Sequence, residues 1–106
     1  MTYRNNIYKI YTDIRFEWDE TKNRLNRTKH GVWFEEAKSV FDDPLAHLFH
    51  DPEHSDEENR FLVLGVSLTA RVLVVSHCYR GSEFQIRLIS ARLATKLERE
   101  FYEEGV

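Results

Sequence analysis

The chain has 106 residues and a formal net charge of −3, with 42% hydrophobic and 13% aromatic residues, which fits one globular domain and argues against intrinsic disorder. No apolar run approaches the roughly 20 residues that span a membrane, and the N-terminus leads into no apolar segment of the kind found in secretory signals. A single cysteine, Cys78, rules out an internal disulfide framework, so we expect a soluble, cytoplasmic protein.

The first part of the chain predicts one strand and two helices. We expect residues 1–15 to be an N-terminal extension, either an edge strand or a mobile segment, and residues 16–106 to be the domain. Residues 16–18 predict a short strand. Asp19 suits a helix N-cap and Gly31 a C-terminal stop, which predicts a surface helix over residues 20–30 with an exposed Asn26. Four apolar residues at helical spacing predict a second short helix: Phe34, Ala37, Val40 and Phe41.

After Pro44 the hydrophobic period changes from 3.6 to 2, which is typical of strands. Residues 45–50, 60–68, 71–80 and 83–90 predict four consecutive strands joined as antiparallel hairpins. A last helix is expected to start near Thr95, where Thr95 and Glu98 have the spacing of a capping box, with Leu97 and Phe101 as its inward pair. The predicted fold class is therefore α+β: a four-stranded antiparallel meander plus a short N-terminal strand, packed by two N-terminal helices and one C-terminal helix.

Charge is distributed unevenly along the chain. Residues 42–58 contain seven acids and no Lys or Arg, whereas residues 60–99 contain seven cations and two acids. This asymmetry predicts an anionic edge and a cationic face that could bind phosphate. The alternative is that the charges scatter over the surface.

Two segments that are far apart in the sequence carry recognisable motifs. The first reads FEWDE at residues 16–20, KHGV at 29–32, FEEA at 34–37 and VFDDP at 40–44, with Asn26 between them. The second reads RLISAR at residues 87–92 and leads into the charged last helix. Together, from about residue 16 to residue 104, they resemble the BrnT family, the toxin half of a bacterial type II toxin–antitoxin pair.

The resemblance implies a fold and a function. BrnT-like proteins are placed with the RelE-type toxins, so it implies a RelE-like fold and a metal-independent endoribonuclease that cleaves mRNA and inhibits translation, without a cofactor. It implies a hetero-oligomer with a BrnA-type antitoxin that carries a ribbon–helix–helix domain. Operator DNA would be bound only through that complex.

Metal-free cleavage of RNA needs a base near the 2′-hydroxyl, an acid near the leaving oxygen, and fixed positive charge for the phosphorane. We predict four arginines and two histidines as catalytic residues: Arg71, Arg80, Arg87, Arg92, His30 and His77. Four further residues are predicted to bind RNA: Lys29, Lys96, Arg99 and Tyr79. Arg80 and Arg87 should approach one groove from adjacent strands with Arg92 at its rim, and Gln85 and Ile89 offer Arg87 no countercharge.

Structural roles remain open for several of these residues. Arg87 and Arg92 could instead pair with Glu17, Glu36 or Glu98. His77 and Tyr79 could be packed sheet residues, and Lys29 and His30 could simply favour a helix C-terminus. A non-catalytic interaction module is the alternative function.

A metal site is a weaker hypothesis. The candidate ligands are His47, His50 and His54 with Asp51, Glu53 and Asp56. His47 and His50 are three residues apart and would point to opposite faces of a strand. We therefore predict no functional metal.

Overall fold

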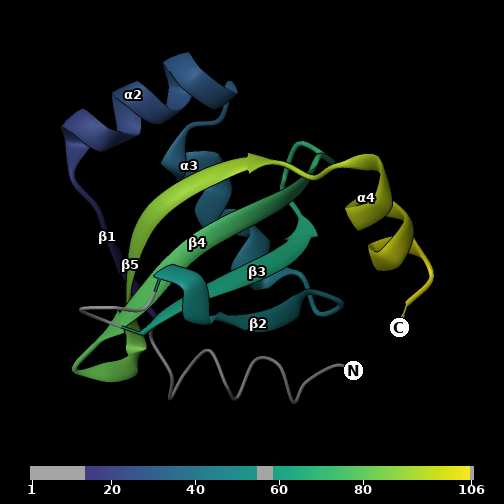
Figure 1. Ribbon diagram of the computed structural model, residues 1–106. Coiled ribbons are helices and arrows are strands. Elements are labelled where there is room, and N and C mark those ends of the chain that lie inside the picture. Colours follow the sequence, from purple (N-terminus) through teal and green to yellow (C-terminus); the bar gives the residue numbers. More distant parts are fainter. Residues whose placement is uncertain (1–13, 55–58, 106) are drawn as a thin grey trace.

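The computed structural model describes residues 14–54 and 59–105. The elements in chain order are β1 (Arg15–Glu17), α2 (Glu20–His30), α3 (Phe34–Ala37) with a 3₁₀ helix (Lys38–Asp42), β2 (His47–Asp51), a 3₁₀ turn (Pro52–His54), β3 (Arg60–Val66), β4 (Val72–Arg80), β5 (Ser82–Leu93) and α4 (Lys96–Glu103). The predicted α+β class is confirmed (Figure 1). The RelE-like label stays a prediction, and most of the proposed N-terminal extension lies outside the described residues.

The sheet has five strands in the order β1-β5-β4-β3-β2. Strands β2 to β5 pair consecutively and antiparallel, whereas β1 pairs parallel to β5, with Glu17 opposite Arg87. β5 continues to Leu93, beyond the predicted end at residue 90, because Arg92 and Leu93 still pair with β4. The parallel pairing with β1, which the hairpin pattern did not predict, determines the surroundings of Arg87.

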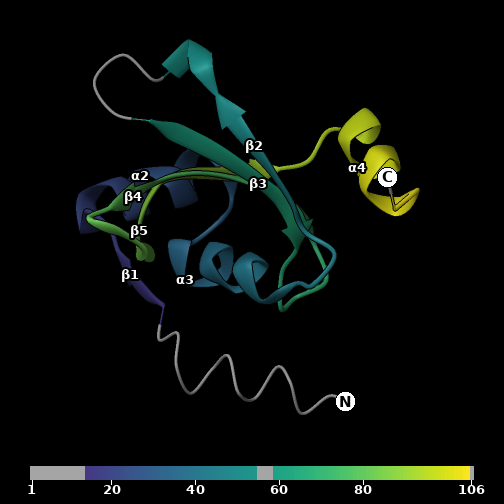
Figure 2. The same ribbon diagram turned by 90° about the horizontal axis from the view of Figure 1, so that it is seen from below.

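The main core lies on the face of the sheet that α3 covers (Figure 2). Alternate strand residues point to this face. They pack against α3 and the 3₁₀ helix that follows it. The cluster contains Val32, Phe34, Ala37, Val40, Val63, Leu73, Val75, Ile86, Leu88 and Ala91. On the other face, a smaller cluster of Leu64, Val74 and Ala94 packs against Tyr102 of α4. None of the helices in the described part is long and apolar enough to cross a membrane.

Two buried asparagines fasten α2 to its neighbours: Asn26 bonds to the sheet, and Asn23 bonds to the start of α3. Its caps are as predicted: the Asp19 side chain accepts from Thr21 and Lys22, and Gly31 is left-handed with a φ of 73°. The expected exposure of Asn26 is wrong, because Asn26 is 6% and Asn23 0% exposed, whereas Leu25 is 62% exposed. The Asn26 amide donates to the carbonyls of Val32 and Ala91 and accepts from the Ala91 N–H. α2 therefore covers the edge of β5 through hydrogen bonds rather than through an apolar stripe.

α4 follows β5 and is capped as its sequence predicts. The Thr95 hydroxyl accepts from the Glu98 N–H, and the Glu98 carboxylate accepts from the Thr95 N–H. Leu97 and Phe101, expected to be the inward pair, are not buried: Leu97 is 77% exposed, and Phe101, 39% exposed, packs its ring against His47 and Phe49 of β2. Tyr102 makes the inward contact instead, and its hydroxyl donates to the Asp43 carboxylate.

Candidate functional site

A partly exposed polar cluster is centred on Glu17, where β1 joins β5. One Glu17 carboxylate oxygen lies 3.0 Å from Nη1 of Arg87, and the other accepts a 2.9 Å hydrogen bond from the Gln85 amide. Hydrogen bonds from Gln85 and Arg87, aided by the positive charge of nearby Arg80, hold the pKa of Glu17 below its ordinary value. The side chains of Arg87 and Glu17 are 33% and 35% exposed, so solvent and ligands reach both.

The cluster lies on the sheet face opposite α3. Gln85 and Arg87 alternate along β5 with Ile86 and Leu88, which belong to the main core. Arg87 is paired with Cys78 of β4, two residues before Arg80. The expectation that Arg80 and Arg87 approach each other from adjacent strands agrees with the influence of both arginines on Glu17. Of the two roles left open for Arg87, pairing with Glu17 is confirmed: the parallel strand β1 supplies the countercharge that Gln85 and Ile89 do not offer.

Arg71 lies elsewhere, at the hairpin between β3 and β4. Its guanidinium donates to both Glu36 carboxylate oxygens and to the Gly31 carbonyl at the end of α2. The hydroxyls of Ser67 and Thr69 also donate to Glu36. The hydrogen bonds from Arg71 lower the pKa of Glu36 to about 2, against the opposing effect of burial. Arg71 therefore ties the hairpin to both N-terminal helices.

Arg92 is held by α4. Its guanidinium donates to both carboxylate oxygens of Glu98, at 2.8 and 3.0 Å. These hydrogen bonds lower the pKa of Glu98 to about 2. The predicted cationic face is thus much weaker than the sequence suggested, because three of its arginines are paired with acids: Arg71 and Arg87 with Glu36 and Glu17 from distant segments, and Arg92 with nearby Glu98.

His77 is a core residue, which corrects its selection as an acid or base that touches RNA. It is 0% exposed and stacks among the rings of Phe41, Phe61 and Tyr79. Burial lowers its pKa, and its Nδ1 is 3.2 Å from the Val75 carbonyl. His77 pairs with Leu88 on the α3 side, so it faces away from the Glu17 cluster. Tyr79 shares this face and is half-buried, and burial raises its pKa.

The remaining predicted residues lie at two other places. Lys29 and His30 form the last turn of α2, where cations suit the helix dipole. Lys96 and Arg99 lie on α4, and Arg99 donates to the Ala94 carbonyl. The structure thus brings together Arg80 and Arg87 and separates them from Arg71, Arg92 and the two histidines.

Sequence reasoning missed Glu17 and Gln85 as members of the cluster. Glu17 was considered only as a structural partner, because a three-residue strand gives no sign of its pairing. The available signal was the polar alternation of β5, in which Gln85 and Arg87 flank Ile86. A polar pair on a largely apolar strand indicates a face that the main core does not cover.

Comparison with known proteins identifies the family. The sequence model described as the ribonuclease toxin BrnT of a type II toxin–antitoxin system matches residues 18–98. The chain belongs to the BrnT family. The crystal structure of the Brucella abortus ribonuclease toxin BrnT is similar, with a TM-score of 0.60 and 25% sequence identity over 78% of this chain and 99% of that one. A search of curated proteins finds no match.

The BrnT match shows what this chain is at a coarse level: a ribonuclease toxin of a type II toxin–antitoxin system, for which RNA is the substrate and an antitoxin the partner. The matched region contains Arg80, Gln85 and Arg87 but begins at residue 18, one residue after Glu17. It also ends inside α4, at Glu98. The family assignment therefore covers the cationic part of the cluster and leaves its acid and the outer half of α4 to be interpreted from the structure.

Among the described residues of this BrnT-family chain, one group could hold a metal ion. Asp51, Glu53 and His54 place ligand atoms within 4.8 Å of one another, and His54 Nδ1 is 3.0 Å from Asp51. The group sits at the exposed end of β2, and Asp56 lies outside the described residues. The prediction that no functional metal is present stays a prediction.

Proposed function

We propose that this BrnT-family chain is a metal-independent endoribonuclease that cleaves mRNA and thereby inhibits translation. The 2′-hydroxyl of the substrate would attack the adjacent phosphorus, which breaks the bond to the 5′-oxygen and leaves a cyclic phosphate. Without a metal ion, a cationic side chain can assist this reaction by stabilising the negative charge on the phosphorane. The Glu17 cluster is the observation that carries the proposal.

Arg87 and Arg80 suit the phosphate-binding role. A guanidinium offers two parallel N–H donors to phosphate oxygens and keeps its charge at every physiological pH. Glu17 holds Nη1 of Arg87 at 3.0 Å, and Gln85 in turn donates a hydrogen bond to the other Glu17 carboxylate oxygen. Because the Arg87 side chain remains 33% exposed, a phosphate can reach the donors that Glu17 does not use. Glu17 is then a positioning residue for Arg87.

The other predicted site residues receive different proposals. Arg71 and Arg92 act on the fold, because Glu36 and Glu98 engage each guanidinium with two hydrogen bonds. Lys29, His30, Lys96 and Arg99 remain candidates for contact with the RNA backbone, since they lie at the surface of α2 and α4. Tyr79 lies on the far face and is proposed as a packing residue.

The partner side of the proposal follows from the family. A BrnA-type antitoxin with a ribbon–helix–helix domain would neutralise the toxin in a hetero-oligomer. That complex would bind the operator of its own operon through the antitoxin, whose ribbon reads the DNA. The chain itself would make no contact with DNA bases.

The test compares variants in a growth assay and a purified RNA-cleavage assay. Arg87→Ala should lower cleavage roughly 10–150-fold, since a charge-assisted contact contributes about 1.5–3 kcal/mol. Glu17→Gln, which keeps the arginine, should lower it less. Lys38→Ala removes an exposed cation on the α3 side and should leave cleavage unchanged.

Circular dichroism separates the catalytic role from a structural one. If Arg87→Ala and Glu17→Gln unfold the chain to the same extent, the pair is structural and the catalytic assignment is wrong. Expression of the wild-type chain alone should arrest growth and deplete intact mRNA, and the adjacent gene should restore both. Normal growth at confirmed high expression, with RNA bound but uncut, would favour the non-catalytic interaction module.

A further inference from the structure

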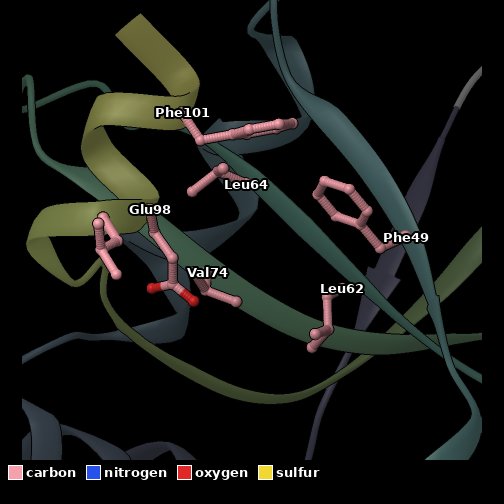
Figure 3. Close-up of a pocket in the computed structure, with 7 residues that line it drawn as sticks. Phe49, Leu62, Leu64, Val74, Glu98 and Phe101 are labelled. Atoms are coloured by element: carbon pink, nitrogen blue, oxygen red, sulfur yellow. The ribbon is translucent and has the colours of Figure 1, made fainter. Parts of the chain in front are cut away.

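An apolar groove lies between α4 and the sheet, on the face that carries the Glu17 cluster. Its volume is about 330 Å³. Leu62, Leu64 and Val74 form its floor, Phe49 of β2 lies on one side, and Phe101 of α4 lies on the other (Figure 3). Leu97 of α4 also lines the groove. The ring centres of Phe49 and Phe101 are 6.0 Å apart.

The groove is preformed, because polar contacts fix α4 to the rest of the fold. The Thr95 capping box starts the helix, the bidentate pair of Arg92 and Glu98 holds its first turn, and Tyr102 anchors its end to Asp43. With the helix fixed in this way, Leu97 remains 77% exposed and Phe49 41% exposed. Large apolar side chains left in solvent on a fixed surface mark a binding site for another molecule.

The charge around the groove indicates the class of that molecule. α4 ends in three exposed acids, Glu100, Glu103 and Glu104, and has no basic residue in its last turn. The partial negative charge at a helix C-terminus disfavours this arrangement, so a cationic partner would relieve it. The same acids repel nucleic acid from this end of α4, whereas Lys96 and Arg99, the candidates for contact with RNA, lie in its first half. The acids also disfavour a twofold dimer of this chain, in which each copy would present the same acidic patch to the other.

We propose that an amphipathic, Lys/Arg-bearing helix of the antitoxin docks in this groove. Its apolar residues would contact Leu97, Phe101 and Phe49, and its cations would face the acids at the end of α4, as in helix-in-groove recognition. The inference rests on the proposed antitoxin partner and adds the surface that binds it.

The position of the groove gives the docked helix a means of neutralising the toxin. Val74, on the groove floor, and Cys78, the partner of Arg87, point to the same face of β4. The two residues are four positions apart along the strand, which is roughly 13 Å. An antitoxin segment that continues from the groove along this face reaches the Glu17 cluster and excludes RNA from it.

The experiment measures binding of the purified product of the adjacent gene to the full chain by calorimetry. Leu97→Glu and Phe101→Glu should each weaken binding at least about tenfold, since truncation or charge at a central apolar contact dominates interface energetics. Leu25→Glu, at a leucine of α2 that is 62% exposed, should bind like the wild type. The double substitution Glu100→Lys with Glu103→Lys should weaken binding and reduce its dependence on salt.

Several results would overturn the proposal. If the wild type binds and both groove variants bind equally well, the surface is wrong although the antitoxin partner stands. If the wild type does not bind at all, the partner itself is wrong. A wild-type dimer in light scattering that Leu97→Glu dissociates would show that a second copy occupies the groove. Exchange protection along β2 rather than α4 in the complex would show strand addition instead of a docked helix.

Discussion

Replacing Asn26 with alanine tests how α2 is attached to the sheet. Asn26 is 6% exposed, and its amide makes three hydrogen bonds of 2.8, 2.9 and 3.0 Å with Val32 and Ala91. The substitution removes all three and leaves the N–H and C=O of Ala91 and the C=O of Val32 without this partner. Each buried polar group left unsatisfied costs about 1–3 kcal/mol, and relaxation recovers part of that. We expect a loss of about 3–5 kcal/mol, a large share of the roughly 5–15 kcal/mol of a whole domain.

The assay is urea unfolding followed by circular dichroism, with the free energy of unfolding taken from the midpoint at unchanged slope. Asn59→Ala is the matched control, because Asn59 is exposed. Hydrogen exchange adds a local measurement: the Ala91 amide should exchange faster in the variant relative to amides in the β3–β4 ladder. A loss below about 1 kcal/mol, similar to that of the control, would refute the view that hydrogen bonds rather than apolar packing hold α2.

The Glu36–Arg71 pair should make stability sensitive to acid. The pKa of Glu36 is lowered from 4.5 to about 2, so its contribution is complete above the unfolded pKa and is lost as pH falls from about 4.5 to about 2. At about 1.4 kcal/mol per pKa unit, acidification should cost the wild type roughly 2–3 kcal/mol more free energy of unfolding than it costs Glu36→Gln. Urea unfolding at pH 7, 4 and 2.5 checks this, and an equal loss in both proteins would contradict it. Cleavage of RNA in a purified assay should survive excess EDTA, whereas loss in EDTA with rescue by Mg²⁺ or Mn²⁺ would overturn the metal-independent mechanism.

Local signals in the sequence predicted the helix ends correctly. Asp19, Gly31 and Thr95 act through their own backbone and the next few residues, so their roles follow from spacing alone. The alternation of apolar residues likewise located the four consecutive strands to within a few residues. These features depend on short-range geometry, which the order of residues already contains.

Contacts between distant segments could not be predicted in this way. Asn23 and Asn26 look like surface residues of a polar helix, and only the approach of residues 32, 34 and 91 makes them buried anchors. The countercharge of Arg87 comes from a residue 70 positions away on a parallel strand. For Leu97 and Phe101, helical periodicity identified an apolar stripe correctly but not that this stripe stays open to solvent.

The pairing of Arg87 with Glu17 also changes how RNA binding should be viewed. An isolated cation would gain the whole phosphate contact, whereas a paired one exchanges part of an existing interaction for the new contact. If Arg87 binds RNA as proposed, the benefit of the pair is geometric: Gln85 orients the Glu17 carboxylate, which holds one guanidinium nitrogen of Arg87 before the substrate arrives. Such preorganisation favours the transition state, because the donors need not rearrange as charge develops on phosphorus. A toxin that uses a prearranged cation, as we propose for Arg87, does not need a broad cationic face, which agrees with the net charge of −3 of this chain.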